Sequence, residues 1–471
     1  MHKARHIALV TLVAFIIAAR VNVSVGEWYA ANIYPIISAG LSFLVSWIPF
    51  SMTEVLAVCA IGLIICLLAK GIRNKDKVWT IALREAELIA WIFIWLYIGW
   101  GMNYFRESIY SRGNIERQPY DEKVFNKFLS DYADSLNYAY TQDSVDLPAF
   151  EDDIKSIYTS VPDSFGLCEP KNWQHPKQLL FNRLYTSVGV GGYIGPFFCE
   201  THINADLLPA QRPYSYAHEL SHLLGVSNED EANFWAYEIC RRSDIPAVRY
   251  SGYYSLLPYV LSNASNVLSA DEYKTYISSI KPEIIQQLID QQNFWKSNYN
   301  KILGKIQSAV YDSMLKANKI SSGTKNYIQV IDLIIAVEME IKVLGTGCCS
   351  KCATLTRNAE DAVKAMGINA SVEEVTDIEK IISYGIMRTP ALAVVETNGR
   401  NVCGSIAIFI SIRILASLLV VLVRISAFGR YFRRIFCIFD TNFGELYYYD
   451  KTADDAERHV EIIPLYALSN L

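Results

Sequence analysis

The chain has few of the features that mark nucleic-acid-binding or disulfide-scaffold proteins. Its 471 residues carry a net charge of −5 and contain no basic tract, so the charge gives no support for a nucleic-acid partner. Ten cysteines are spread thinly, which excludes a small disulfide scaffold without fixing the redox compartment. We find no internal repeat. At this length, two or three folded units are expected.

Apolar sequence is in excess, at 52% of the residues, and gathers near the N-terminus and in one late stretch. A transmembrane region is therefore predicted over residues 1–104. Its helices are expected near residues 7–23, 52–70 and 85–103. The first apolar run, Ile7–Ala19, is also short enough for the core of a signal peptide. Ile33–Phe50 contains two prolines and is expected to be interfacial or re-entrant, with a fourth span as the alternative.

Basic residues between the second and third predicted helices set the expected orientation. They are Lys70, Arg73, Lys75, Lys77 and Arg84. By the positive-inside rule this loop is cytoplasmic, so the chain after about Asn103 emerges on the opposite side. We expect a multi-pass protein of the cell inner membrane, with residues 105–337 as a folded domain on the extracytoplasmic (periplasmic) side.

The composition of residues 105–337 predicts a mainly helical α+β domain. Helical periodicity is strongest over Asp121–Tyr140, Ala232–Arg242 and Glu283–Ala317. Leu179–Ile203 is rich in glycine and in β-branched and aromatic residues, so strand and turn are expected there.

One motif in this domain carries chemistry, the sequence His-Glu-Leu-Ser-His at residues 218–222. Residues four apart share a helix face, so His218 and His222 can reach one ion, and Zn²⁺ is the expected cofactor. Glu219 is then placed to take a proton from a bound water.

A catalytic zinc needs a third protein ligand, and an acidic segment follows the motif closely. Glu229 is the predicted ligand, with Glu231 as the alternative. Asn233 lies one turn after Glu229 and could orient a ligand. His202 and Glu200 are expected to be structural.

The pattern Glu-x-x-Ala-Asn at residues 229–233, taken with the His-Glu-x-x-His motif, resembles the gluzincin-like pattern of membrane zinc peptidases. Those proteins have Asp where this chain has Asn233. Residues 1 to about 337 are also similar to a family of uncharacterised Bacteroidetes membrane proteins. The matching stretches are Ile48–Ser51, Gly192–Glu200, Ala217–His222, Glu229–Phe234 and Tyr311–Asn318. The likeness implies a zincin-like ectodomain in which His218, His222 and Glu229 bind zinc and Glu219 is the base.

A second candidate site is the pair Cys349 and Cys352, expected at a helix N-terminus where the helix dipole favours a thiolate. Residues 339–403 resemble small thioredoxin-like redox proteins, and the resemblance implies that Pro390 faces a redox-active disulfide. An α/β thioredoxin-like domain is therefore expected over residues 338–403. Cys348 makes the pairing ambiguous, and a buried cysteine cluster is the alternative.

The remaining sequence contains a candidate transmembrane helix at residues 404–424, interrupted by Arg413, and a tail of unknown role at residues 425–471. Met339 stands where small thioredoxin-like proteins usually begin, so a fusion of two neighbouring genes, natural or artefactual, would explain the join.

The sequence thus predicts a multi-domain, membrane-anchored zinc metallopeptidase that acts on a peptide or protein substrate. Two alternatives stay open. One is a non-hydrolytic zinc-binding membrane protein, and the other is a thiol-disulfide oxidoreductase that works through Cys349 and Cys352.

Overall fold

The computed structural model describes most of the N-terminal two thirds of the chain and parts of the remainder. The described residues are 2–113, 115, 121–161, 163–318, 330–337, 339–345, 350–366, 370–377, 381, 391–395, 401–405, 435–440, 445–450 and 462–464. They form two compact units. The first comprises Met1–Ser108, Phe125–Thr159 and Gly166–Ile331, and the second comprises Ile109–Val124, Ser160–Phe165 and Asp332–Leu471.

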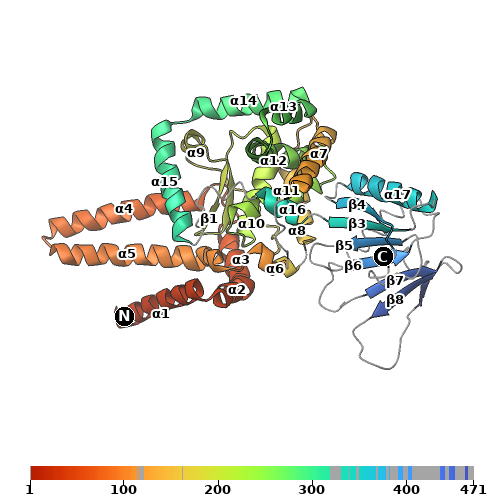
Figure 1. Ribbon diagram of the computed structural model, residues 1–471. Coiled ribbons are helices and arrows are strands. Elements are labelled where there is room, and N and C mark those ends of the chain that lie inside the picture. Colours follow the sequence, from red (N-terminus) through yellow and green to blue (C-terminus); the bar gives the residue numbers. More distant parts are fainter. Residues whose placement is uncertain are drawn as a thin grey trace. The chain divides into compact units, whose positions relative to one another are not determined.

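Three long helices open the first unit: α1 (His2–Val21), α4 (Met52–Arg73) and α5 (Val78–Gly99) (Figure 1). Among the described residues, α1 and α4 are long and apolar enough to cross a membrane. The third predicted span, α5, is as long as α4 but carries Arg84, Glu85 and Glu87 in its first half and does not meet that criterion. Two apolar helices near the N-terminus are therefore available as membrane anchors.

The proline-containing segment between the first two long helices forms two shorter helices, α2 (Val23–Asn32) and α3 (Tyr34–Val45). Pro35 lies in the first turn of α3, where its missing N–H costs no hydrogen bond. At 12 residues α3 is too short to cross a bilayer, which agrees with the interfacial or re-entrant expectation better than with a fourth span.

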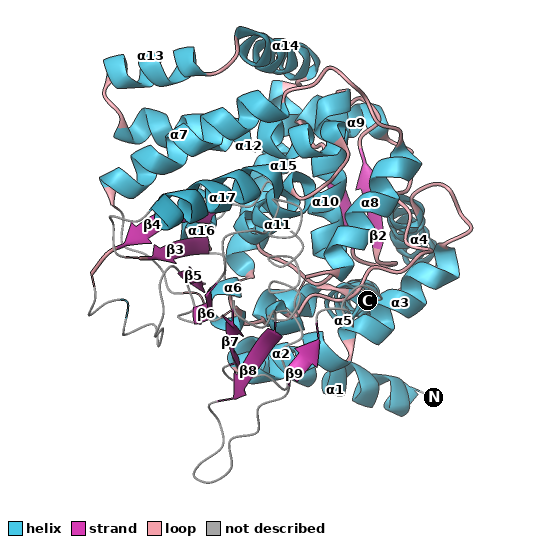
Figure 2. Ribbon diagram, turned by 90° about the vertical axis from the view of Figure 1, so that its right-hand side faces the viewer, coloured by secondary structure: helices cyan, strands magenta, loops and turns pink. Residues whose placement is uncertain are grey.

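The rest of the first unit is helical apart from one hairpin (Figure 2). Its helices are η1 (Gly101–Phe105), α7 (Glu122–Ala139), α8 (Leu147–Thr159), α9 (Asn182–Val188), η3 (Pro209–Gln211), α10 (Arg212–Leu223), α11 (Glu229–Arg241), α12 (Pro246–Val267), α13 (Ala270–Ser279), α14 (Pro282–Asn298) and α15 (Lys301–Ala317). The strands β1 (Gly192–Gly195) and β2 (Glu200–Ile203) pair antiparallel. Every residue of α11 is buried, so this helix is the centre of the unit.

The structure divides one of the segments in which helical periodicity was expected. The continuous helical periodicity over Glu283–Ala317 is divided into α14 and α15. The break comes at Asn300, whose side-chain oxygen accepts hydrogen bonds from the amides of Ile302 (3.0 Å) and Leu303 (3.1 Å). Asparagine thereby caps a new helix, and the chain changes direction there.

The N-terminal helices pack directly on the hairpin. Trp95 of α5 lies edge-on to Phe197 and Phe198 in the β1–β2 turn, with ring centroids 5.8 and 5.4 Å apart. Phe197 also lines an apolar cavity of about 1180 Å³ among α1, α3, α4 and α5. Contacts of this kind join the predicted transmembrane region, residues 1–104, to the part of the predicted ectodomain that belongs to the first unit.

The second unit is built on a mixed sheet with the order β4-β3-β5-β6-β7-β8-β9. Its elements, with the linking helix, are α6 (Ile109–Arg112), η2 (Asp163–Phe165), α16 (Val330–Ala336), β3 (Met339–Leu344), α17 (Ser350–Met366), β4 (Ala370–Val375), β5 (Ala391–Val395), β6 (Asn401–Ser405), β7 (Ile435–Asp440), β8 (Glu445–Asp450) and β9 (Ile462–Pro464). β3 and β4 are parallel and joined through α17, whereas β5 is antiparallel to both β3 and β6. This is the α/β arrangement expected for residues 338–403.

The C-terminal tail, for which the sequence predicted no structure, adds strands to this sheet. The tail at residues 425–471, which offered no motif, contributes β7, β8 and β9 to the sheet. The span predicted over residues 404–424 falls outside the described residues from 406 onward, and its first two residues end β6.

Candidate metal centre

Helix α10 carries both histidines of the motif, and its two ends are defined by the local sequence. Pro213 lies in its first turn, and Gly225 follows its last turn with a φ of +101°, a conformation that glycine adopts without strain. The amide of Val226 returns to the backbone oxygen of Ser221 at 3.0 Å. This reversal turns the chain directly into α11, whose first residue is Glu229.

Three side chains from α10 and α11 converge on one point. Nε2 of His218 and Nε2 of His222 are 3.2 Å apart. Oε2 of Glu229 lies 3.2 Å from the first nitrogen and 3.6 Å from the second. These three residues form the group of potential metal ligands found in the described part of the chain. Ligand atoms around a tetrahedral zinc with bonds of about 2.0–2.1 Å are about 3.3 Å apart, so the triangle has a suitable size.

Neighbouring groups fix the orientation of these ligands. Nδ1 of His222 bonds to the backbone oxygen of Val226 at 2.9 Å, which makes Nδ1 the protonated nitrogen and leaves the Nε2 lone pair for an ion. The Tyr311 hydroxyl donates to Oε1 of Glu229, which leaves Oε2 facing the histidines. Trp100 donates from its indole nitrogen to the backbone oxygen of His222 at 2.8 Å.

The two other polar residues predicted near the ligands have different contacts. Glu231, the alternative ligand, is outside the group of three and accepts a hydrogen bond from Trp235 Nε1 at 3.3 Å. Asn233 accepts a hydrogen bond at 3.0 Å from the Tyr214 hydroxyl. Both residues are buried.

Glu219 is buried between α10 and the hairpin, beside the ligand cluster. A Cβ at Gly192 of β1 would lie 2.8 Å from Oε1 of Glu219, so only glycine leaves room for the carboxylate there. Burial raises the pKa of Glu219 to about 7, against the lowering effect of the two histidines.

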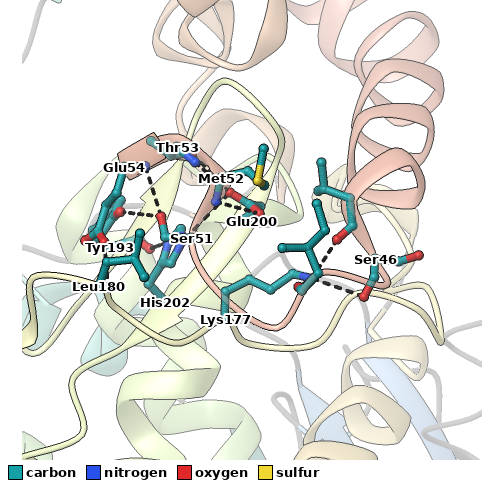
Figure 3. Close-up of polar contacts among 12 residues, drawn as sticks. Ser46, Ser51, Met52, Thr53, Glu54, Lys177, Leu180, Tyr193, Glu200 and His202 are labelled. Carbon is teal, nitrogen blue, oxygen red and sulfur yellow. Dashed lines mark hydrogen bonds and ion pairs between the residues drawn. The ribbon is translucent and has the colours of Figure 1, made fainter. Parts of the chain in front are cut away.

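The hairpin that confines Glu219 is fixed to the start of α4 (Figure 3). The Glu200 carboxylate accepts hydrogen bonds from the amides of Met52 (3.3 Å) and Thr53 (3.1 Å), at the N-terminus of α4. Such a helix end favours an anion. His202 stacks on Tyr193, with ring centroids 4.2 Å apart. These contacts suit the structural roles expected for Glu200 and His202.

Lys177 strengthens the same junction from the loop before α9. Its ammonium group is buried and donates to the backbone oxygens of Val45 (2.8 Å) and Ser46 (3.1 Å), and also to that of Ile48. These bonds attach the connection between α3 and α4 to the domain that carries His218, His222 and Glu229.

Of the second candidate site, the structure describes Cys352. This residue is buried in the first turn of α17. Gly345 follows the end of β3 and is so close to Cys352 Sγ that a side chain at residue 345 would collide with it. Cys348, Cys349 and Pro390 lie outside the described residues.

Three residues of the metal centre carry no local sequence signal. Tyr311 is 82 residues from Glu229, and Trp100 is 122 residues from His222. Gly192 is one of several glycines in its segment. Tyr311 and Gly192 do lie in the stretches that carry the resemblance to the uncharacterised membrane family, which was the one available signal.

Comparisons with known proteins divide the chain between residues 335 and 339, where its composition also changes. Residues 339–403 match the model described as "Thioredoxin domain". A thioredoxin from Methanothermobacter thermautotrophicus is 41% identical over 56 residues, which are 12% of this chain and 71% of that protein. No solved structure matches the chain. The predicted C-terminal thioredoxin domain is therefore confirmed. Residues 29–335, more than half of the chain, match the model described as "Protein of unknown function (DUF3810)", and the chain belongs to that family.

Proposed function

We propose that this protein is a membrane-anchored zinc metallopeptidase. In this proposal His218, His222 and Glu229 hold the zinc ion and Glu219 is the general base. The observation that carries the proposal is the triangle of two imidazole nitrogens and one carboxylate oxygen, with edges of 3.2, 3.2 and 3.6 Å, beside a buried carboxyl group.

The donor set fits zinc in number and kind. Two neutral imidazoles and one carboxylate are a usual set for a catalytic zinc, which keeps a fourth position open, whereas structural sites use four protein ligands. Oε2 of Glu219 is buried and has no hydrogen-bond partner among the described residues. A water molecule held between this oxygen and the ion would satisfy it.

The ion would supply Lewis-acid polarisation of the scissile carbonyl and acidify a water molecule. Glu219 would accept a proton from that water while the water oxygen bonds to the carbonyl carbon. Glu219 would then deliver the proton to the leaving nitrogen as the carbon–nitrogen bond breaks. The products are one carboxylic acid and one amine, which exchange a proton to become a carboxylate and an ammonium ion, and Glu219 returns to its starting state.

The hairpin offers a way to align a substrate. β1 pairs with β2 alone in the described part of the chain, so one backbone edge of β1 has no strand partner. An extended peptide that added to this edge would pass Gly192 and the Glu219 carboxylate beside it.

Membrane anchoring is supported by the charges at one end of the long helices. The last turn of α4 carries Lys70 and Arg73, and the α4–α5 connection carries Lys75 and Lys77. Arg5, near the start of α1, pairs with Glu87 of α5, with Nε and Oε1 2.7 Å apart. Basic residues of α1, of the end of α4 and of the α4–α5 connection thus gather at the end away from the proposed metal centre. The positive-inside rule places this end in the cytoplasm and the metal centre on the periplasmic side of the inner membrane.

The first test is the metal content of the purified full chain, measured by mass spectrometry. We expect about one zinc per chain, lost in His222→Ala and Glu229→Gln and kept in the matched variant Glu231→Gln. A folded chain that takes up no zinc after reconstitution would refute the proposal. Equal loss in both glutamate variants would refute Glu229 as the specific ligand.

The second test separates a peptidase from a protein that only binds zinc. A peptide library is incubated with the native chain and with Glu219→Gln, and new termini are identified by mass spectrometry. We expect cleavage by the native chain and none by the variant, which should keep its zinc. Equal cleavage by both would refute Glu219 as the base. Zinc binding without any cleavage would favour the non-hydrolytic alternative.

A second activity, thiol-disulfide exchange through Cys349 and Cys352, is favoured by a separate observation. The C-terminal residues match a thioredoxin domain, and Cys352 is buried at the start of α17. The two activities reside in different compact units and can be tested independently.

A further inference from the structure

Helix α15 exposes an apolar face to its surroundings. Ile302, Ile306 and Val310 follow one another at intervals of four residues and are 73%, 57% and 66% exposed. Leu303 and Met314 extend this face and are also exposed. The residues that α15 buries lie on its other side, at positions such as Gly304 and Leu315. A helix that is apolar on both sides is expected to have a partner on each side.

A second group of exposed apolar residues continues this surface. Leu180, Phe181 and Leu184, at the start of α9, are 50%, 46% and 51% exposed. α9 packs against α15, and the amide of Asn300, just before α15, donates to the backbone oxygen of Ser187 at 2.7 Å. We call these eight residues the α9–α15 face: Leu180, Phe181, Leu184, Ile302, Leu303, Ile306, Val310 and Met314.

The segments that carry the α9–α15 face form hydrogen bonds with the ends of the long N-terminal helices. Arg20, at the end of α1, donates to the backbone oxygen of Ala317 at 2.7 Å. Tyr97, near the end of α5, donates to Oδ1 of Asn318 at 2.8 Å. The Glu54 carboxylate, in the first turn of α4, accepts from the amide of Leu180 at 2.7 Å.

These three contacts lie at the same end of the three helices. The ends of α1 and α5 and the beginning of α4 all face the domain that carries the metal centre, and the basic α4–α5 connection lies at the opposite end. Figure 1 shows α15 running across the direction of α4 and α5, on the side of the unit from which those helices project. If α1 and α4 cross a bilayer, α15 lies at its surface.

We propose that the α9–α15 face rests on the surface of the bilayer in which α1 and α4 are anchored. The proposal depends on the membrane anchoring proposed above and not on zinc or on hydrolysis. The partner is phospholipid. The apolar side chains enter the boundary between headgroups and acyl chains, and Lys301 and Lys305 of the same helix lie near the anionic headgroups.

This contact would have a consequence for the metal centre. Tyr311 of α15 donates its hydroxyl hydrogen to Glu229, so the helix that rests on lipid also holds a zinc ligand. Bilayer contact would therefore stabilise the position of α15 from one side while Tyr311 orients Glu229 on the other.

The test uses the full chain in vesicles of phosphatidylethanolamine and phosphatidylglycerol that include a phospholipid with a diazirine in its acyl chain. After irradiation, lipid adducts are mapped by mass spectrometry. We expect adducts on α4, which serves as the positive control for anchoring, and on residues 302–314 and 180–184. Tyr138 of α7 is 70% exposed and serves as the negative control, because α7 lies away from the membrane helices in Figure 1.

A double substitution, Ile306→Asp with Val310→Asp, should abolish the adducts on α15 and leave those on α4. Both side chains are exposed, so folding should be preserved, and Tyr138→Asp is the matched exposed control. Adducts on α4 without adducts on α15 in the native chain would overturn the surface contact and leave the anchoring intact. The absence of adducts from α4 as well would overturn both. The assay reads neither zinc nor cleavage, so failure of the peptidase proposal would be seen separately.

Discussion

Tyr311 on α15 donates its hydroxyl hydrogen to Oε1 of Glu229 on α11, although 82 residues separate them. This contact holds the carboxylate so that its other oxygen faces the two histidines. Because partners of metal ligands tune affinity, we expect Tyr311→Phe to weaken zinc binding by about 10- to 100-fold. Competition with a chelator of known affinity measures the change. Tyr138→Phe, at an exposed position, is the control, and equal affinities in all three proteins would contradict the assigned role.

A substitution at Gly192 tests the position of the proposed general base, Glu219, without altering a proposed zinc ligand. A Cβ at this residue would lie 2.8 Å from Glu219 Oε1 and 2.7 Å from the backbone oxygen of His202, so Gly192→Ala should displace the carboxylate. We expect kcat to fall by roughly 100-fold while zinc content is unchanged. The neighbouring change Gly191→Ala meets its nearest atom, in Leu207, at an ordinary 3.4 Å and should have little effect. Similar activity in both variants would argue against this placement of Glu219.

The junction between α4 and the hairpin should make stability depend on pH. Burial, aided by the Lys177 charge, lowers the pKa of His202 to about 3, from an ordinary value of about 6.5 in the unfolded chain. Below pH 6.5 the unfolded chain binds a proton that the folded chain does not. The stability linked to this residue is therefore complete above about pH 6.5 and is lost as the pH falls toward about 3.

The substitution His202→Phe keeps a ring against Tyr193 and removes the titrating group. We expect the unfolding free energy of this variant to vary less between about pH 6.5 and 4 than that of the native chain. Denaturant titrations of both proteins in detergent, at several pH values, measure the difference. Parallel pH profiles would show that His202 does not remain neutral in the folded state.

The thioredoxin domain gives a prediction of its own. The Cys349 thiolate should attack a substrate disulfide to form a mixed disulfide, and Cys352 should then displace the substrate thiol. Dithiothreitol, as the reductant, would restore the dithiol. We expect Cys349→Ser to abolish reduction of a model protein disulfide and Cys352→Ser to accumulate the mixed disulfide. Cys348→Ser is the matched control and should stay active. Activity that requires Cys348 instead would reassign the pair.

The sequence was informative where chemistry and local geometry coincide. The four-residue spacing of His218 and His222, with Gly225 after them, predicted a short helix that presents both rings, and α10 has this form. The choice between Glu229 and Glu231 depended on how α11 meets α10, which no local pattern specifies. In the structure the first of the two joins the histidines.

The sequence was least informative where a single side chain redirects the chain. The helical periodicity of the sequence runs through Glu283–Ala317 because both halves of this segment favour helix. The break that the side chain of Asn300 makes there, by capping a new helix, was not recognised from the sequence. This break allows α15 to turn and bring Tyr311 to Glu229. The boundary between α14 and α15 and the contact of Tyr311 with Glu229 were therefore both missed because the cap at Asn300 was not recognised.

The polar junction shown in Figure 3 also limits how this protein can be divided. A fragment that begins near residue 105 would retain Glu200 and Lys177 but lose the amides and carbonyl groups of residues 45–53 that pair with them. Buried charges without partners are strongly destabilising. Proteolytic release of this domain from α4 would therefore destabilise it, and if the proposed peptidase activity holds, only the intact, anchored molecule would be active.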